Sequence, residues 1–194
     1  MSWIAPVTLT DSHVRLEPLR ADHAEGLRAA VSDGDIWKIW YTSIPAPDQI
    51  AHEIARRLEL QAAGSMLPFA TCAPDGRVLG MTTYMNIDSA NRRLEIGSTF
   101  LRASAHRTPV NTQAKRLMLG HAFEQLGCVA VEFRTHHMNR QSQAAIERLG
   151  ARRDGILRAH MVLPDGSLRD THVYSILAHE WPAVRRGLDA RLAR

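Results

Sequence analysis

Residues 104–112 combine hydroxyl, amide and cationic side chains just before an amphipathic helix pattern. Thr108 followed by Pro109 is typical of a helix N-cap with proline at the first helical position. The first amides of a helix have no intrahelical partner and lie at the positive end of its dipole, which favours phosphate. The alternative is that Thr108 only caps its helix. An anion site here would draw on His106, Arg107, Thr108, Val110, Asn111, Thr112 and Lys115.

The second candidate is a carboxylate in the middle of a strand-like segment, residues 92–101. Glu95 is costly to bury unless it is paired or used, and burial raises the pKa of a carboxyl toward the range of a general base. Pairing with Arg92 or Arg134 is the structural alternative. Gly97 predicts a bulge that separates this strand from a neighbour. Alternation puts Glu95, Gly97 and Thr99 on one face of this strand and Leu94, Ile96 and Phe100 on the other. Three other residues are weaker candidates for the general base: Glu132, His136 and His160.

The elements that must position these residues follow from hydrophobic periodicity and turn signals. A helix enclosed by two strands is a crossover, and open α/β sheets bind ligands beyond the carboxyl ends of such strands. The apolar segment 36–45 reads as core, with a pocket wall as the alternative. We therefore predict one α/β domain over residues 1–194. Its strands are expected at 13–19, 67–73, 77–87, 92–101, 129–137 and in a hairpin over 155–177, and its helices at 20–34, 45–64, 109–127, 139–150 and 179–192.

The composition excludes several classes of protein. The 194-residue chain is 45% hydrophobic with a net charge of +4, and it has neither a long apolar run nor a secretory signal pattern. No membrane span is predicted, and a cytoplasmic location is expected. Cys72 and Cys128 lack ligand spacing, so no metal site is predicted. The basic segment 184–194 reads as a solvated helix face, and direct nucleic-acid binding is not expected.

The order of elements resembles the GCN-related N-acetyltransferase (GNAT) superfamily, and more closely its Rim-type ribosomal-protein alanine acetyltransferases. The resemblance covers residues 13–182. It implies an α/β (α+β) fold with a mixed, mostly antiparallel twisted sheet of about seven strands flanked by helices. It also implies acetyl-CoA as co-substrate, without a metal. The segments that carry it are RLEPL at 15–19, RRLEIGSTFL at 92–101, VNTQAKRLMLGHAFEQLG at 110–127, VEFRTHHMNRQSQAAIERLGA at 131–151 and LPDGSLRDTHVYSIL at 163–177.

The resemblance also implies roles for individual residues. Backbone amides along Thr99, Phe100 and Leu101 would polarise the thioester carbonyl. Asn139 matches an asparagine that contacts the pantetheine arm, although it could equally be a plain N-cap. The tyrosine that many members use as an acid aligns with Ile146, so that role passes to Ser142 or to water.

Two glycines of the usual diphosphate loop align with Pro109 and Asn111, and proline removes an amide donor. The expected reaction is direct acetyl transfer to a primary amine. The acceptor stays open among a protein N-terminus (a ribosomal protein being one candidate), a polyamine, an amino acid and an antibiotic. The final hairpin and segment 36–45 are expected to wall the acceptor cleft. The alternative function is a weak or inactive CoA-binding module, and the oligomeric state cannot be predicted.

Overall fold

The computed structural model describes residues 3–193 and contains one eight-stranded sheet with the order β1-β2-β3-β4-β5-β6-β8-β7. Neighbouring strands pair antiparallel except β5 and β6, which are parallel. The predicted mixed, mostly antiparallel sheet is confirmed, with one strand more than predicted. The strands are β1 (Leu9–Asp11), β2 (Val14–Pro18), β3 (Met66–Cys72), β4 (Val78–Asp88), β5 (Arg93–Leu101), β6 (Ala130–His136), β7 (Arg152–Val162) and β8 (Leu168–Leu177).

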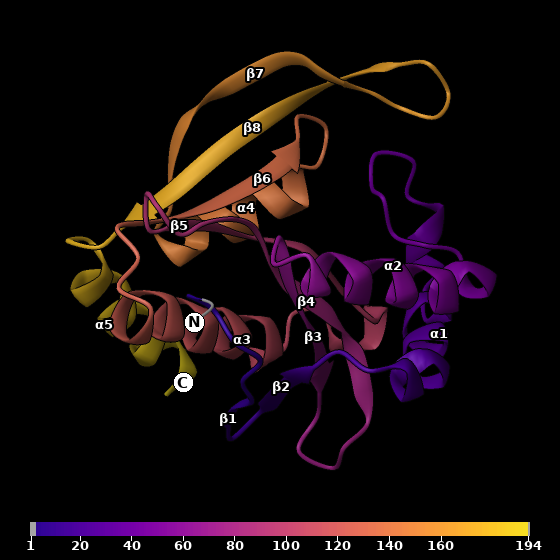
Figure 1. The fold of residues 1–194 in the computed structure, drawn as a ribbon, viewed down its shortest axis with the longest axis horizontal. Helices are drawn as coiled ribbons and strands as arrows, with labels where there is room; N and C mark the ends of the chain where they lie inside the picture. Colours follow the sequence, from indigo (N-terminus) through magenta and orange to yellow (C-terminus); the bar gives the residue numbers. More distant parts are fainter. Residues whose placement is uncertain (1–2, 194) are drawn as a thin grey trace.

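Helices cover both faces of this sheet (Figure 1). One buried cluster joins α1 and α2 to residues such as Met81 and Phe100. A second cluster joins α3, α4 and α5 to residues such as Leu94 and Ile96. Within residues 3–193, no helix is long and apolar enough to cross a membrane. The helices are α1 (Ala24–Ser32), α2 (Ile50–Ala62), α3 (Pro109–Gly120), α4 (Arg140–Leu149) and α5 (Trp181–Leu192).

The sheet opens between its two central strands. The parallel ladder between β5 and β6 consists of only three residue pairs, from Arg93 with Ala130 to Glu95 with Glu132. Beyond Glu95 the pairing of β5 with β4 skips a residue, and Ser98 adopts a left-handed φ of 49°. This is the bulge that Gly97 predicts, and it separates β5 from β6.

The bulge also reverses the alternation expected for β5. Before it, Leu94 and Ile96 face α3, as the sequence pattern indicates. After it, Phe100 packs in the α1–α2 cluster, whereas Thr99 turns toward α3. The prediction that Phe100 shares a face with Leu94 is therefore wrong, because one extra residue shifts the two-residue period.

Several element boundaries differ from those expected. The strand β1 was not predicted, because three residues are too short for a period to be visible. Helix α3 is shorter than the predicted helix and continues as a π-helical turn over His121–Gln125. Short 3-10 turns at Ala21–His23 and Pro47–Gln49 precede α1 and α2, so these helices begin later than the predicted ranges 20–34 and 45–64.

Candidate active site

The loop between β5 and α3 is fixed by an aspartate at the end of α1. Asp33 accepts hydrogen bonds from Arg102 Nε at 2.7 Å and from Ser104 Oγ at 2.6 Å. These contacts hold the pKa of Asp33 below its usual value. At the other side of the loop, His106 Nε2 donates to the Leu101 carbonyl at 2.9 Å. Asp33 was not found by sequence reasoning, because it lies about 70 residues from the loop it anchors.

The start of α3 keeps its free amides. Thr108 occupies the N-cap position and Pro109 follows it, as predicted, but the Thr108 side chain makes no capping hydrogen bond. Its hydroxyl donates instead to the Ala105 carbonyl at 2.7 Å. No acidic residue lies in the first turn of α3, and the exposed Arg107 precedes it. Uncapped amides at the positive end of a helix dipole suit an anion such as a diphosphate.

A hollow of about 390 Å³ adjoins this helix start. Two basic side chains, His13 and Arg77, contribute to its wall, and no acidic residue does. Its lining residues are Ser12, His13, Ala73, Pro74, Arg77, Leu79, Ser104, Ala105, Thr108, Pro109 and Val110.

Glu95 lies where β5 and β6 begin to separate, and it is 5% exposed. Burial raises its pKa, although Asn86 and Arg134 oppose this effect. Asn86 Nδ2 donates to Glu95 Oε2 at 2.7 Å, and Arg134 Nε lies 3.5 Å from the same oxygen. A Cβ at Gly97 would lie 2.8 Å from Glu95 Oε1, so the glycine leaves room for the carboxylate. Both interpretations of Glu95 therefore have support: it pairs with Arg134 rather than Arg92, and its pKa is shifted toward that of a base.

The weaker candidate bases are engaged in other contacts. Glu132 forms ion pairs with Arg93 and Arg134. His136 Nδ1 accepts the Met138 amide at 3.0 Å, so Nε2 carries the proton of the neutral ring and has no lone pair with which to act as a base. His160 lies on the exposed strand β7, with its Nδ1 3.1 Å from Thr171 Oγ1.

The start of α4 carries the predicted acid and pantetheine residues. Asn139 is the N-cap, and its side chain accepts the Ser142 amide at 3.0 Å. Ser142 is half-buried. Ile146 is buried in the core cluster that includes α3, so the tyrosine position holds a packing residue. The proposed roles of Ser142 and Asn139 toward a ligand stay predictions.

Lys115 occupies a different place from the one expected. Its ammonium lies at the β5 bulge rather than at the loop before α3, because it donates to Thr99 Oγ1 at 2.8 Å and to Thr82 Oγ1 at 2.9 Å. Burial lowers the pKa of Lys115 to about 7. Asn111 and Thr112, by contrast, lie half-buried in the first turn of α3, as expected.

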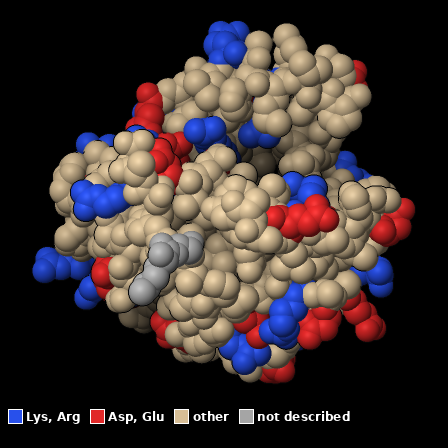
Figure 2. Space-filling model, viewed as in Figure 1, with Lys and Arg blue, Asp and Glu red and all other residues tan. Residues whose placement is uncertain are grey.

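The segment 36–45 lies against the end of β6. Trp40 is 60% exposed, and its ring centroid lies 5.5 Å from that of His136, with Tyr41 at 6.0 Å. The default interpretation of this segment as core therefore holds for Ile36 but not for Trp40. Figure 2 shows the surface hollowed below the β7–β8 hairpin, with Lys and Arg side chains at the rim. A partly exposed aromatic segment beside such a hollow suits a binding wall.

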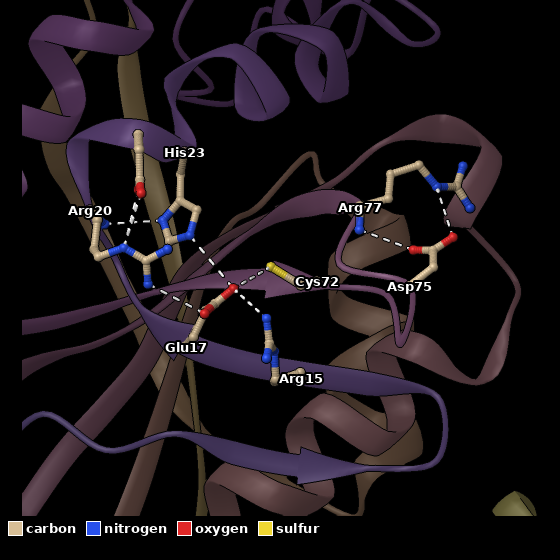
Figure 3. A network of polar contacts seen from close by, with 8 residues as sticks. Arg15, Glu17, Arg20, His23, Cys72, Asp75 and Arg77 are labelled. Carbon is tan, nitrogen blue, oxygen red and sulfur yellow. Dashed lines mark hydrogen bonds and ion pairs between the residues drawn. The ribbon is translucent and has the colours of Figure 1, made fainter.

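A second polar cluster lies between β2, β3 and the start of α1 (Figure 3). Ligand atoms of Glu17, His23 and Cys72 lie within 4.8 Å of one another, a grouping that sequence spacing could not reveal. His23 Nδ1 accepts the Arg20 amide at 3.1 Å, so its Nε2 carries a proton and offers no lone pair to a metal. Arg15 and Arg20 also pair with the Glu17 carboxylate. The cluster is therefore a hydrogen-bond network that fixes the start of α1.

Comparison with known proteins gives consistent matches. Residues 13–152 match the acetyltransferase (GNAT) domain family. A Bacillus subtilis (strain 168) protein named "Putative ribosomal N-acetyltransferase YdaF" is 32% identical over 107 residues, which span 55% of this chain and 57% of that protein.

Two solved structures have the same fold. A GCN5-related N-acetyltransferase from Brucella melitensis superposes with a TM-score of 0.86 at 32% identity, over 97% of this chain and 86% of that one. Mycobacterium smegmatis RimJ, in complex with CoA-disulfide, superposes with a TM-score of 0.81 at 24% identity, over 96% and 95% of the two chains. The family match covers more than half of the chain and agrees with the opened sheet and the uncapped helix start. The chain belongs to the GNAT family of N-acetyltransferases.

Proposed function

We propose that this chain, acting as one domain in the cytoplasm, transfers the acetyl group of acetyl-CoA directly to the α-amine at a protein or peptide N-terminus. The observation that carries the proposal is a buried carboxylate, Glu95, at the point where β5 and β6 part. The uncapped start of α3 follows the same strand. The strand β5 thus has a candidate base near its beginning and a candidate anion site beyond its end. This arrangement suits a donor that carries a thioester at one end and a diphosphate further along.

On the donor side, the amides of Val110 and Asn111 and the side chains around Arg107 would hold the diphosphate of acetyl-CoA. Asn139 would contact its pantetheine arm. The backbone from Thr99 to Leu101 would polarise the thioester carbonyl. Glycine is absent from the loop, so the amide donors come from a conventional first helical turn.

On the acceptor side, the amine attacks the thioester carbon, the carbon–sulfur bond breaks and an amide bond forms. Glu95 accepts the proton of the amine, directly or through a water. An α-amine has a pKa of about 8, against about 10.4 for lysine, so it is already partly neutral at pH 7. The leaving group is a thiolate, and because its thiol has a pKa of about 8.5 it needs little acid assistance. Ser142 or a water donates the proton that the thiolate takes up.

The charges around Glu95 favour an acceptor that presents a carbonyl or carboxylate beside its amine. Arg134 pairs with Glu95, and Arg169 of β8 acts on it electrostatically. Arg134 also pairs with Glu132, so its charge is balanced, but both guanidinium groups can donate to the carbonyl of an N-terminal residue, an acceptor that a polyamine lacks. A ribosomal protein is the acceptor that the name of the Bacillus subtilis relative suggests.

The test is an acetylation assay with matched acceptors. The purified chain is incubated with acetyl-CoA and a lysine-free peptide with a free N-terminus, a blocked peptide with one lysine, or spermidine, and the products are measured by mass spectrometry. We expect acetylation of the free N-terminus at the highest rate. Preference for lysine or spermidine would refute the proposed acceptor. Calorimetric binding of acetyl-CoA without turnover on any amine would instead favour a binding module.

A further inference from the structure

Two buried basic side chains donate hydrogen bonds to the β5 bulge, one from each face of the sheet. Arg57 comes from α2, and Lys115 comes from α3. Each donates to one residue of the bulge and to one facing threonine of β4, where the pairing of the two strands skips. We call this arrangement, Arg57 with Ser98 and Lys115 with Thr99, the bulge clamp.

Arg57 is 2% exposed. Its guanidinium donates to Ser98 Oγ at 2.5 Å and to Thr83 Oγ1 at 2.6 Å, while Glu53 balances its charge at 2.7 Å. All three contacts fix one orientation of the guanidinium fork. Ser98 is the bulge residue with the left-handed φ, so Arg57 braces the most distorted position of the strand.

Lys115 is 5% exposed and reaches the bulge from the other side. Its ammonium donates to Thr99 and Thr82, whose hydroxyl oxygens lie 2.8 Å apart. Among residues 3–193 no carboxylate forms an ion pair with it, and burial is the one cause of its lowered pKa. Whenever Lys115 is protonated, which its lowered pKa restricts to about pH 7 and below, the clamp therefore carries one positive charge without a counter-charge beside the opening in the sheet.

Such a cation is a costly way to hold two threonines. A neutral donor would make the same hydrogen bonds without desolvating an ammonium. Costly charges inside a protein are typical of functional sites, where positive potential is useful at the point at which negative charge develops. The bulge amides are where the thioester carbonyl would be polarised under the proposed function.

We propose that Arg57 and Lys115 are positioning residues for acetyl transfer, which act through Ser98 and Thr99 to hold the bulge in the shape that polarises the thioester. This inference rests on the proposed function. It assigns the clamp to the chemical step, so its loss lowers kcat rather than raising the KM for acetyl-CoA.

The first test replaces Lys115 by methionine, a neutral side chain of similar length. We expect kcat to fall by about tenfold or more, as for loss of a donor that acts on the transition state. The KM for acetyl-CoA should change less than about threefold, and the melting temperature should rise because a buried charge is gone. A purely structural lysine would lower the melting temperature and leave kcat unchanged. The control is Arg116→Met, which removes a cation of α3 that pairs with Asp189 away from the bulge.

The second test is Ser98→Gly, which removes the hydroxyl that Arg57 holds while glycine readily adopts the same φ. We expect a lower kcat with an unchanged melting temperature. The control is Arg92→Gly, an exposed position with a φ of 48° outside the clamp, which should keep the wild-type kcat.

The outcomes separate the two proposals. If the wild-type chain acetylates an amine and both clamp variants keep its kcat within about twofold, the clamp is refuted and the proposed function stands. If the wild-type chain acetylates no amine, the proposed function fails and the clamp fails with it. A fall in kcat in both variants, with both controls active, supports the clamp.

Discussion

Replacing Lys115 by methionine should stabilise the fold most at low pH. Burial lowers the pKa of Lys115 from 10.5 to about 7, so the unfolded chain binds the proton more tightly than the folded chain. The destabilisation is complete below pH 7 and disappears as the pH rises toward 10.5. It amounts to about 5 kcal/mol at pH 6 and about 2 kcal/mol at pH 9. Little opposes this gain, because the hydroxyls of Thr82 and Thr99 lie 2.8 Å apart and can bond to each other.

The assay is urea denaturation of the wild type and the variant at pH 6 and pH 9. The difference in the free energy of unfolding should be larger at pH 6 by about 3 kcal/mol. Arg116→Met serves as the control, since an arginine stays charged across this range and gives no such trend. A difference that does not depend on pH, or a variant less stable than the wild type at pH 6, would show that the ammonium is not desolvated as described.

Three further predictions concern the base, the helix start and the thiols. Glu95→Gln should lower kcat by about 100-fold or more. As the pH is lowered, the wild-type rate should fall with a pKa above 4.5, and the variant should not show this fall if Glu95 is the base. Pro109→Gly adds an amide to the start of α3 and should tighten CoA binding by up to about tenfold in calorimetry, whereas unchanged affinity would argue against a diphosphate there. Burial raises the pKa of Cys72 and Cys128 to about 12, so neither thiol of the native chain should react with iodoacetamide at pH 8, and early labelling in mass spectra would contradict this.

Local patterns in the sequence predicted the features that depend on neighbouring residues. Thr108 and Pro109 marked the start of α3, and Gly97 marked the bulge. The period of the strands and helices gave their order, and with it the crossover in which the start of α3 follows the strand that carries Glu95. These signals act over a few residues, so a single sequence contains them.

The features that were missed depend on contacts between distant segments. The alternation of β5 failed at Phe100 because a bulge shifts the period without a trace in hydrophobicity. Lys115 was predicted to belong to the anion site at the start of α3, since no sequence pattern shows that its ammonium donates to two threonines of β4 and β5. Asp33 and Arg57 act across more than 25 residues of sequence, where spacing alone carries no information.

The three-pair ladder between β5 and β6 has a mechanical consequence. It divides the sheet into two parts, which are joined by few backbone hydrogen bonds. One part contains β1 to β5, and the other contains β6, β8 and β7. A short ladder opens at lower free energy than the long ladders on either side of it. Amide exchange should therefore be faster at these three pairs than in the long ladders on either side.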